Sequence, residues 1–498
     1  MNKIIKEFAN TNPQVKEEKR GFPNLGTRKD KKEYSSSVRK IEEAWDIYDC
    51  QLYTWANENK IVNLGNGNPL KYKPFKGALN NLYRKFKTNM YEYGAAAGDE
   101  EDREKIAQYL IKEGFNKELT YKNVIVTDST TMAFSIIIRT IFNENDVILM
   151  TSPNYGLFTF MPERENINVE VVELREEDNY KINPKILKER IDEINKKLKK
   201  IYKDIKPQPR VRAFFNSNPH NPMGTVLNSK DISLMNQIGE ICQENNMFII
   251  DDLIYRDLTY DRSDLAKPMG TIDKYFDNTI SLFGLSKSYG LAKARSGFVV
   301  ANEVIIRALR DQIFYLMDSV SSVQTALMSG AYNPSKKRYK EYDRYFNKLI
   351  PKYIFNRDLC CALVNGIESI VKTKNYRKVK KLLKKNLNQE DYEKIRTGIE
   401  DLKIVHNPES GFFMLIDFSN LKKYNVFRTE KDILELLYKK CSIKFLVGQS
   451  ISWPNEKQNI IRISYSLDHD TLIESFNNIN KVIMEVKNET NRNNNSRK

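Results

Sequence analysis

A lysine and an arginine eight positions apart, Lys287 and Arg295, are the residues of this chain with the clearest chemical potential. Both belong to the segment Ser281–Phe298, and the lysine comes just after a short apolar run. A desolvated lysine amine loses its proton readily and can then form a Schiff base with an aldehyde. The planar guanidinium of an arginine suits a phosphate. Pyridoxal phosphate carries both groups, although an ordinary surface helix can also contain such a pair.

The elements around this segment follow a regular alternation of short Val- and Ile-rich runs with longer amphipathic stretches. This alternation predicts a mainly parallel sheet with helices on both faces. The expected strands are Val124–Val126, Val147–Met150, Val169–Val172, Ala213–Asn216, Phe248–Asp251, Thr279–Phe283 and Phe298–Ala301. The expected helices are Thr131–Phe142, Lys185–Ile205, Ser229–Asn245 and Ile305–Ser319.

Polar and aromatic side chains follow several of these strands. Ligands of open α/β sheets bind outside the carboxyl ends of the strands, so these positions are candidates for a site. They are Ser129–Thr131 at a helix start, Tyr155 on a turn, Asn218 and Asn221 between prolines, Asp252 with Tyr255, and Lys287. Each has a plain structural alternative: a helix cap, a half-buried aromatic, a simple turn, or an ion pair with Arg256. Together they combine an anion site, a ring-stacking aromatic, hydrogen-bonding groups, a carboxylate and a lysine.

These motifs resemble those of a known family, and they occur in the same order from about Ile61 to Ser466. NPHNPMG resembles the N-P-x-N-P-x-G signature of the fold-type I pyridoxal-phosphate enzymes, in particular the class I/II, aspartate-aminotransferase-like aminotransferases. GLSKSYGLAKARSGF is similar to their lysine segment, and DDLIY to their D-x-x-Y strand end. SPNYG and YGAAAG resemble two further loops of the same family.

The resemblance implies an α/β fold with two domains. A large domain with a mainly parallel seven-stranded sheet flanked by helices is expected over residues 61–333. A smaller α+β domain is expected to combine an N-terminal arm and helix (1–60) with residues 334–487, including a lysine-rich helical insertion near 368–404. Residues 488–498 are polar and are expected to form a disordered tail.

The resemblance also implies pyridoxal 5'-phosphate as cofactor and gives five residues roles near its ring. Lys287 would hold the cofactor as a lysine-bound aldimine and then move the substrate proton. Asp252 would pair with the pyridine nitrogen and keep the ring an electron acceptor. Asn221 and Tyr255 would hydrogen-bond the phenolic oxygen, and Tyr155 would stack on the ring.

Other residues would hold the phosphate and the substrate. The phosphate would be bound by Ser129, Thr130, Ser286 and Arg295, joined by Tyr93 from the partner subunit of a homodimer. Arg462 would bind the substrate α-carboxylate, with Asn221 nearby and the backbone at Gly67 closing over it. No metal is expected.

The sequence departs from the family pattern in three places. Gly284 stands where a serine is usual, Lys293 occupies a position that is often small, and the phosphate loop reads DSTT where many members have a glycine. Two lysine-rich helical stretches, Lys185–Arg210 and about Glu368–Ile404, look inserted relative to a compact member. The sequence assigns them no role.

The expected activity is transfer of an amino group between an amino acid and a 2-oxo acid. Two alternatives stay open at this point. One is a lyase, a decarboxylase or an enzyme similar to 1-aminocyclopropane-1-carboxylate synthase, because the same residues serve all of these reactions. The other is a catalytically inactive binding protein. The substrates are not identified, and the aromatic run Tyr48, Tyr53 and Trp55 could line a pocket or, as we favour, belong to the core.

Composition narrows the class of protein. The net charge is +16, but the excess is mostly lysine in Lys196–Lys206 and Lys372–Lys385, without interleaved aromatics, so we expect solvated helix faces and no nucleic-acid partner. Five scattered cysteines favour free thiols in a reducing compartment, and three dispersed histidines do not suggest zinc. Without a signal peptide or an apolar run of about 20 residues, we expect a cytoplasmic protein that does not enter the membrane.

Overall fold

The computed structural model describes residues 61–87, 91–424, 430–447 and 459–495. These residues all fall in one compact unit. The expected N-terminal arm and helix over residues 1–60 lie outside the described residues, and so do Tyr48, Tyr53 and Trp55. Within the described part of the chain, no helix is long and apolar enough to cross a membrane.

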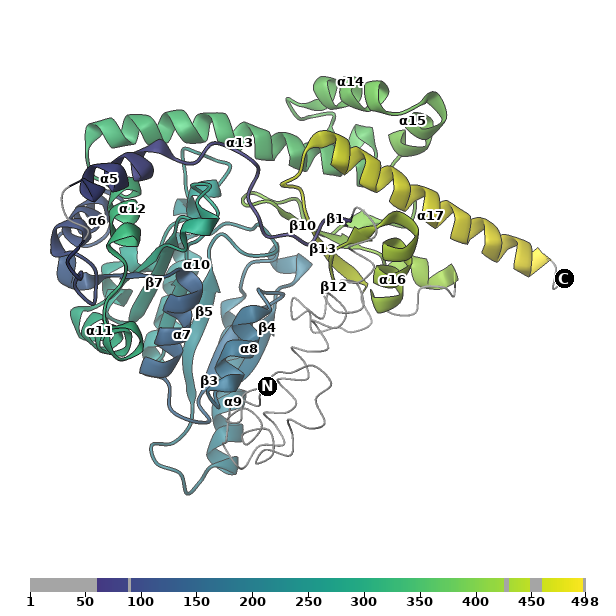
Figure 1. Ribbon diagram of the computed structural model, residues 1–498. Helices are drawn as coiled ribbons and strands as arrows, with labels where there is room; N and C mark the ends of the chain where they lie inside the picture. Colours follow the sequence, from purple (N-terminus) through teal and green to yellow (C-terminus); the bar gives the residue numbers. More distant parts are fainter. Residues whose placement is uncertain (1–60, 88–90, 425–429, 448–458, 496–498) are drawn as a thin grey trace, which may run out of the picture. The chain divides into compact units, whose positions relative to one another are not determined.

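Seven strands form the main sheet, in the order β2-β8-β7-β6-β5-β3-β4 (Figure 1). All neighbouring pairs are parallel except the two that include β8, which is antiparallel to β2 and β7. The predicted sheet is confirmed, with strand ends moved by one or two residues. The strands are β2 (Val124–Thr127), β3 (Val147–Ser152), β4 (Asn168–Glu173), β5 (Val211–Ser217), β6 (Phe248–Asp252), β7 (Thr279–Gly284) and β8 (Gly297–Val300).

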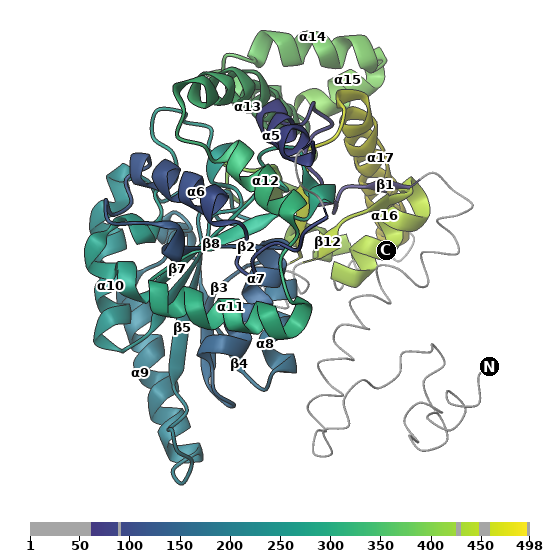
Figure 2. The ribbon, with the colours of Figure 1, turned by 60° about the vertical axis from the view of Figure 1, so that its left-hand side comes forward.

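Helices cover both faces of this sheet, as Figures 1 and 2 show. Two adjacent residues of β5 illustrate this, because successive strand side chains point to opposite faces. Phe214 belongs to the apolar cluster under α9 and α10, whereas the ring of Phe215 contacts Phe134 of α7 and Phe158 of α8. The helices are α5 (Lys76–Phe86), α6 (Glu100–Lys112), α7 (Thr130–Ile141), α8 (Leu157–Arg164), α9 (Pro184–Ile201), α10 (Ile232–Glu244), α11 (Glu303–Met317) and α12 (Ser322–Ala331).

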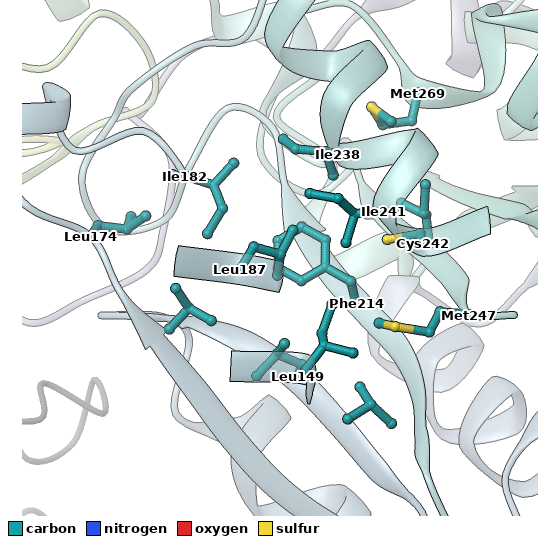
Figure 3. Packing of buried hydrophobic residues seen from close by; sticks show 14 of the residues in the cluster. Leu149, Leu174, Ile182, Leu187, Phe214, Ile238, Ile241, Cys242, Met247 and Met269 are labelled. Atoms are coloured by element: carbon teal, nitrogen blue, oxygen red, sulfur yellow. The ribbon is translucent and has the colours of Figure 1, made fainter. Parts of the chain in front are cut away.

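The lysine-rich helix α9 is part of the main core rather than an addition to it. Leu187, Ile191, Ile194 and Leu198 recur at helical spacing and are all buried. They join a cluster that also contains residues of β3, β5 and α10, some of which Figure 3 shows. The lysines of α9 face away from this cluster and are exposed, as the composition predicted.

A second set of strands combines residues from both ends of the described chain. β1 (Val62–Asn63) pairs in parallel with β11 (Ile443–Lys444). A four-stranded antiparallel sheet has the order β12-β13-β10-β9. Its strands are β9 (Lys403–Ile404), β10 (Phe413–Asp417), β12 (Leu446–Val447) and β13 (Ile460–Ser464).

Five helices accompany this sheet: α13 (Lys336–Asn365), α14 (Tyr376–Asn386), α15 (Gln389–Arg396), α16 (Glu430–Cys441) and α17 (His469–Asn495). Residues 488–498 were expected to form a disordered tail, but α17 continues to Asn495. Its apolar face extends as far as the buried Val486, and a helix that is already packed extends by one hydrogen bond per added residue. The domain boundaries at 333 and 487 stay predictions.

Candidate active site

Three neighbouring strands of the main sheet carry the principal candidates at the same edge. β5, β6 and β7 are parallel to one another, so their carboxyl ends lie together. β5 leads into the Asn–Pro loop, β6 ends on Asp252, and β7 ends three residues before Lys287. The edge at which the sequence predicted a site therefore exists.

Lys287 lies in a half-buried position, and its amine Nζ donates a hydrogen bond to the carbonyl of Gly67 at 2.7 Å. Burial lowers the pKa of this amine to about 8, and the charges of Arg462 and Arg295 act in the same direction. The negative charge of Asp252 acts in the opposite direction and raises this pKa. An amine with this pKa is partly neutral near pH 8, which is the form that attacks a carbonyl carbon.

Asp252 is a buried carboxyl group that faces the lysine. Burial raises its pKa to about 7, and a hydrogen bond from the Ile254 backbone N–H together with the charge of Lys287 moderates the increase. The preceding Asp251 lies on the other face of the strand, where Asn216 and the Met269 backbone bind its two oxygens at 2.7 and 2.8 Å. Of the two adjacent aspartates, only Asp252 faces the site.

The Asn–Pro loop uses its two asparagines differently. The side chain of Asn218 bonds the backbone of Leu227 in both directions and the carbonyl of Lys267, which closes the loop. The Oδ1 of Asn221 instead accepts a hydrogen bond from Nη1 of Arg462 at 3.3 Å. The sequence offered both amides, and the fold directs only Asn221 toward the site.

His220 is a neutral side chain that holds this loop through hydrogen bonds. Its Nδ1 accepts a hydrogen bond from the Met223 N–H, so Nε2 carries the proton and donates to Thr151 Oγ1 at 2.8 Å. Burial lowers the pKa of the imidazole to about 3. His220 is therefore a structural residue rather than a proton carrier at neutral pH.

Arg462 lies on β13, outside the main sheet, and reaches the same edge. It is 3% exposed, and its Nη2 donates to the carbonyl of Gly65 at 3.0 Å. The guanidinium also lies 4.0 Å from the centroid of the Phe413 ring. Gly65 and Phe413 are contacts that the sequence reasoning missed. The alternation of β10 could have indicated Phe413, which is a diagonal neighbour of Arg462 in the β10–β13 register.

Two tyrosines complete the wall of the site. Tyr255 is 4% exposed, and its ring meets Phe412 and Phe413 edge-on. Tyr155 is 37% exposed, and its ring stands edge-on to Phe158 at a centroid distance of 5.2 Å. Burial raises the pKa of both phenols. The charges of Arg462, Arg295 and Asp252 act on the pKa of Tyr155 and also on that of Lys287. Both side chains therefore border the same site.

The start of α7 carries the predicted hydroxyl groups. Ser129 is its N-cap, and its Oγ accepts a hydrogen bond from the Met132 N–H at 3.3 Å, while Thr130 is the first helical residue. Ser129 has a φ of 122°, a conformation that glycine adopts far more easily. The N–H groups and hydroxyls of such a helix start favour an anion.

The remaining predicted residues differ in how far they are buried. Ser286 is buried, whereas Arg295 is exposed, with its Nη1 bonded to the Ala292 carbonyl. Tyr93 is 92% exposed, and no contact within the described chain brings it to the site. A Cβ at Gly284 would lie 2.6 Å from Cδ1 of Ile254, so a side chain there would require the Ile254 side chain to shift.

No group of three or more His, Cys, Asp or Glu side chains within the described residues could hold a metal ion. The sequence profile of the family described as "Aminotransferase class I and II" matches residues 59–479. The chain belongs to this family. It is therefore an aminotransferase that depends on pyridoxal phosphate, as the motifs predicted.

Individual aminotransferases are similar over nearly the whole chain. A probable aspartate/prephenate aminotransferase of Aquifex aeolicus is 25% identical over 437 residues, which cover 86% of this chain and 92% of the relative. A structure of a Thermus thermophilus aspartate aminotransferase mutant covers 93% of this chain and all of its own, with a TM-score of 0.69 and 18% identity. The aromatic aminotransferase of Pyrococcus horikoshii has a TM-score of 0.65 and 20% identity, over 91% of this chain and 99% of its own.

The groups at this edge fit pyridoxal phosphate by their chemistry. The amine of Lys287 has a lowered pKa, as bonding to an aldehyde requires, and Asp252 offers a buried carboxyl to a ring nitrogen. The start of α7, with its two hydroxyls, and the arginine at 295 suit the phosphate. The aminotransferase fold therefore presents a donor set for each end of the cofactor.

Proposed function

We propose that Lys287 is the amine that bonds the cofactor aldehyde and later carries the substrate proton. One observation carries this proposal: a half-buried lysine lies near two arginines and one carboxyl, with an amine pKa of about 8. An amine of this kind can bond a carbonyl and, once released, accept and return a proton near neutral pH. The Gly67 carbonyl, 2.7 Å away, provides a hydrogen-bond acceptor for the released amine.

We propose that pyridoxal phosphate, when bound, supplies an electron sink for the bonds of the substrate α-carbon. Asp252 maintains that capacity by holding a proton at the ring nitrogen, since a buried carboxylate is stabilised by a cation beside it. Tyr155 would cover the ring, and Asn221 and Tyr255 would offer hydrogen bonds to its phenolic oxygen. These residue roles rest on the neighbourhood described above.

Arg462 binds the α-carboxylate of the amino acid in this proposal. A guanidinium that is buried and oriented by Asn221, by the Gly65 carbonyl and by the Phe413 ring loses little freedom when it forms a bidentate pair. The geometry therefore supports an α-amino acid and a 2-oxo acid as the two substrates. Both present the same carboxylate, and both occupy the site in turn.

The phosphate is held at the start of α7 in this proposal, by Ser129, Thr130, Ser286 and Arg295. Tyr93 comes from a second copy of the chain. Its aromatic side chain is exposed, as are those of Tyr91, Phe314 and Tyr315. Exposed large aromatic side chains are common at protein interfaces. They support a homodimer with shared active sites.

We also propose a cytoplasmic location. Four cysteines in the described residues are free thiols, and Cys360 and Cys361 are adjacent, buried and unoxidised. Free thiols of this kind are typical of a reducing compartment.

The test of the proposed reaction is a single-turnover experiment with the purified, cofactor-loaded protein. A panel of amino acids, aspartate first because several relatives are named aspartate aminotransferases, is added without any oxo acid. We expect one equivalent of the amine form of the cofactor per site, and a 2-oxo acid should then restore the aldehyde form. Continuous release of ammonia or of a cleaved product, without stoichiometric conversion of the cofactor, would favour the lyase alternative.

The binding-protein alternative is tested by the cofactor itself. The loaded protein should absorb visible light through the bond at Lys287, and borohydride should fix the cofactor on that residue. A purified protein that gains no such bond with added pyridoxal phosphate would exclude the proposed enzyme.

A further inference from the structure

Two turns of the main sheet, one after β6 and one after β7, are tied together beside the site. The turn after β6 carries Asp252, and the turn after β7 carries Lys287. The hydroxyl of Ser288 donates to the Ile254 carbonyl at 3.3 Å, and the phenol of Tyr289 donates to Asp257 Oδ2 at 2.9 Å. Two hydrogen bonds therefore join the segment of the carboxyl to the segment of the amine.

Asp257 is a buried carboxylate that accepts hydrogen bonds from several side chains. It is 2% exposed, and its Oδ1 accepts a hydrogen bond from the phenol of Tyr342 at 2.7 Å and one from Arg256 Nη1 at 3.3 Å. Arg256 in turn bonds Glu113 at 2.5 Å. A buried carboxylate with a cation and two phenols is held firmly, because removal of any donor would leave part of its charge without compensation.

Tyr289 also reaches the segment that contacts the lysine from the other side. Its backbone carbonyl accepts a hydrogen bond from the Phe75 N–H at 3.1 Å. Its ring is fully buried and lies edge-on to Phe75 and Phe346, with centroids 5.3 and 5.5 Å away. The chain from Gly67 to Phe75 is thus attached at one end to the Lys287 amine and at the other to Tyr289.

We propose that Tyr289 is a positioning residue, which holds the Lys287 turn against the Asp252 strand end through its hydrogen bond to Asp257. This inference rests on the proposed role of Lys287. Neither Tyr289 nor Asp257 touches the reacting groups. They act by keeping the lysine turn closed, so that water does not enter beside the amine.

The experiment compares two variants that each delete one phenol donor from Asp257. Tyr289→Phe removes the donor that lies on the lysine turn, and Tyr342→Phe removes the donor that lies on α13. Both variants lose a buried hydrogen bond, which should lower the unfolding temperature. Because both keep the aromatic ring, the decrease should be only a few degrees. The measured quantity is the rate at which the cofactor-free chain bonds pyridoxal phosphate as a function of pH, trapped at Lys287 by borohydride.

We expect the midpoint of this profile near pH 8 in the unchanged protein. Tyr289→Phe should raise it by about half a unit or more, because water near the amine weakens the effect of burial. Tyr342→Phe should leave it unchanged. The charged groups that face the amine, Arg462, Arg295 and Asp252, are the same in all three proteins.

Equal midpoints in the two variants would overturn the proposal, because Tyr289 would then contribute to stability alone. If Tyr289→Phe does not fold, Ser288→Ala removes the other bond between the same two turns and decides the question. An upward shift in Ser288→Ala supports the positioning role, and an unchanged midpoint contradicts it. Failure of the unchanged protein to form any trapped bond at Lys287 would instead contradict the proposed function.

Discussion

The chain places cations in two contrasting regions, the turn after β7 and the segment around α14. Burial and two neighbouring arginines lower the amine pKa of Lys287 to about 8, whereas the carboxyl of Asp252 acts in the opposite direction. Seven cations around α14 are exposed, and none makes an ion pair with another described residue: Lys372, Lys374, Arg377, Lys378, Lys381, Lys384 and Lys385. The two regions have the same type of residue but very different surroundings.

The difference shows that burial, more than residue type, gives a lysine its chemistry. Water stabilises the charged form of an exposed amine, which keeps it protonated and unreactive at neutral pH. In α14 only the apolar face, with Val379 and Leu383, is buried against the rest of the protein. Substitutions near Lys287 should therefore reduce amino transfer much more than substitutions of the exposed lysines of α14.

The largest effect is expected for Lys287→Ala. This change removes both the bond to the cofactor and the proton carrier, so the rate of amino transfer should fall by about 10⁴-fold. Steady-state transfer to a 2-oxo acid measures it, with Lys381→Ala as the matched control that removes an exposed lysine. Comparable rates in the two variants would show that Lys287 has no special role.

Asp252→Asn should have the next largest effect. An amide cannot hold a proton at the ring nitrogen, so transfer should slow by about 10³-fold although the cofactor still binds. Rate and visible absorption, measured on the same sample, separate these two properties. Asp251→Asn is the control, since that side chain faces away from the site, and a greater rate loss there would reverse our assignment.

Lys287 should also give the cofactor-free protein a specific pH dependence of stability. Because its pKa is about 8 in the folded chain and 10.5 ordinarily, the unfolded chain binds more protons between these values, and stability rises with pH across this window. Lys287→Met lacks this term, so near pH 7 it should be more stable than the unchanged protein by about 3 kcal/mol.

Urea unfolding at pH 7 and at pH 10 measures the difference between the two proteins. The advantage of Lys287→Met should shrink toward the higher pH, since the unchanged lysine is then neutral in the folded chain. Parallel stability profiles would mean that the amine keeps its ordinary pKa after folding.

A smaller effect is expected at the phosphate. Arg295→Ala removes a charged partner and should weaken cofactor retention by about 10- to 100-fold, whereas Ser286→Ala should weaken it less. The arginine matters here because Gly284 supplies no hydroxyl to the phosphate. Dialysis of the loaded variants provides the comparison, and equal retention would place the phosphate elsewhere.

The smallest effect is expected in α14. The double substitution of Lys381→Glu and Lys385→Glu reverses two exposed charges and should change the transfer rate by less than about twofold and stability by less than about 0.5 kcal/mol. The same transfer assay and a urea titration measure both. A large loss of rate would assign α14 a part in the reaction that its exposed position does not suggest.

Much of the fold could be predicted because the signals are local. Strand periodicity placed β2 to β8, and the side chains after β5, β6 and β7 marked one edge of the sheet. Contacts between segments that are distant in the sequence were harder to predict. Arg462 meets Asn221 and Gly65 only because β13 is brought beside the main sheet, and without the family resemblance its sequence context marks an ordinary strand residue.

The sequence by itself determined the order of the motifs, the residue types at the strand ends and the family to which they point. Tertiary structure decided the partners within each pair: Asn216 binds Asp251, and the backbone of Leu227 binds Asn218, whereas Asn221 meets Arg462. It also decided that Ile254 packs against Gly284 and that Tyr289 binds Asp257. The physical reason is that burial, hydrogen-bond partners and pKa depend on neighbours hundreds of residues away, which a local pattern does not specify.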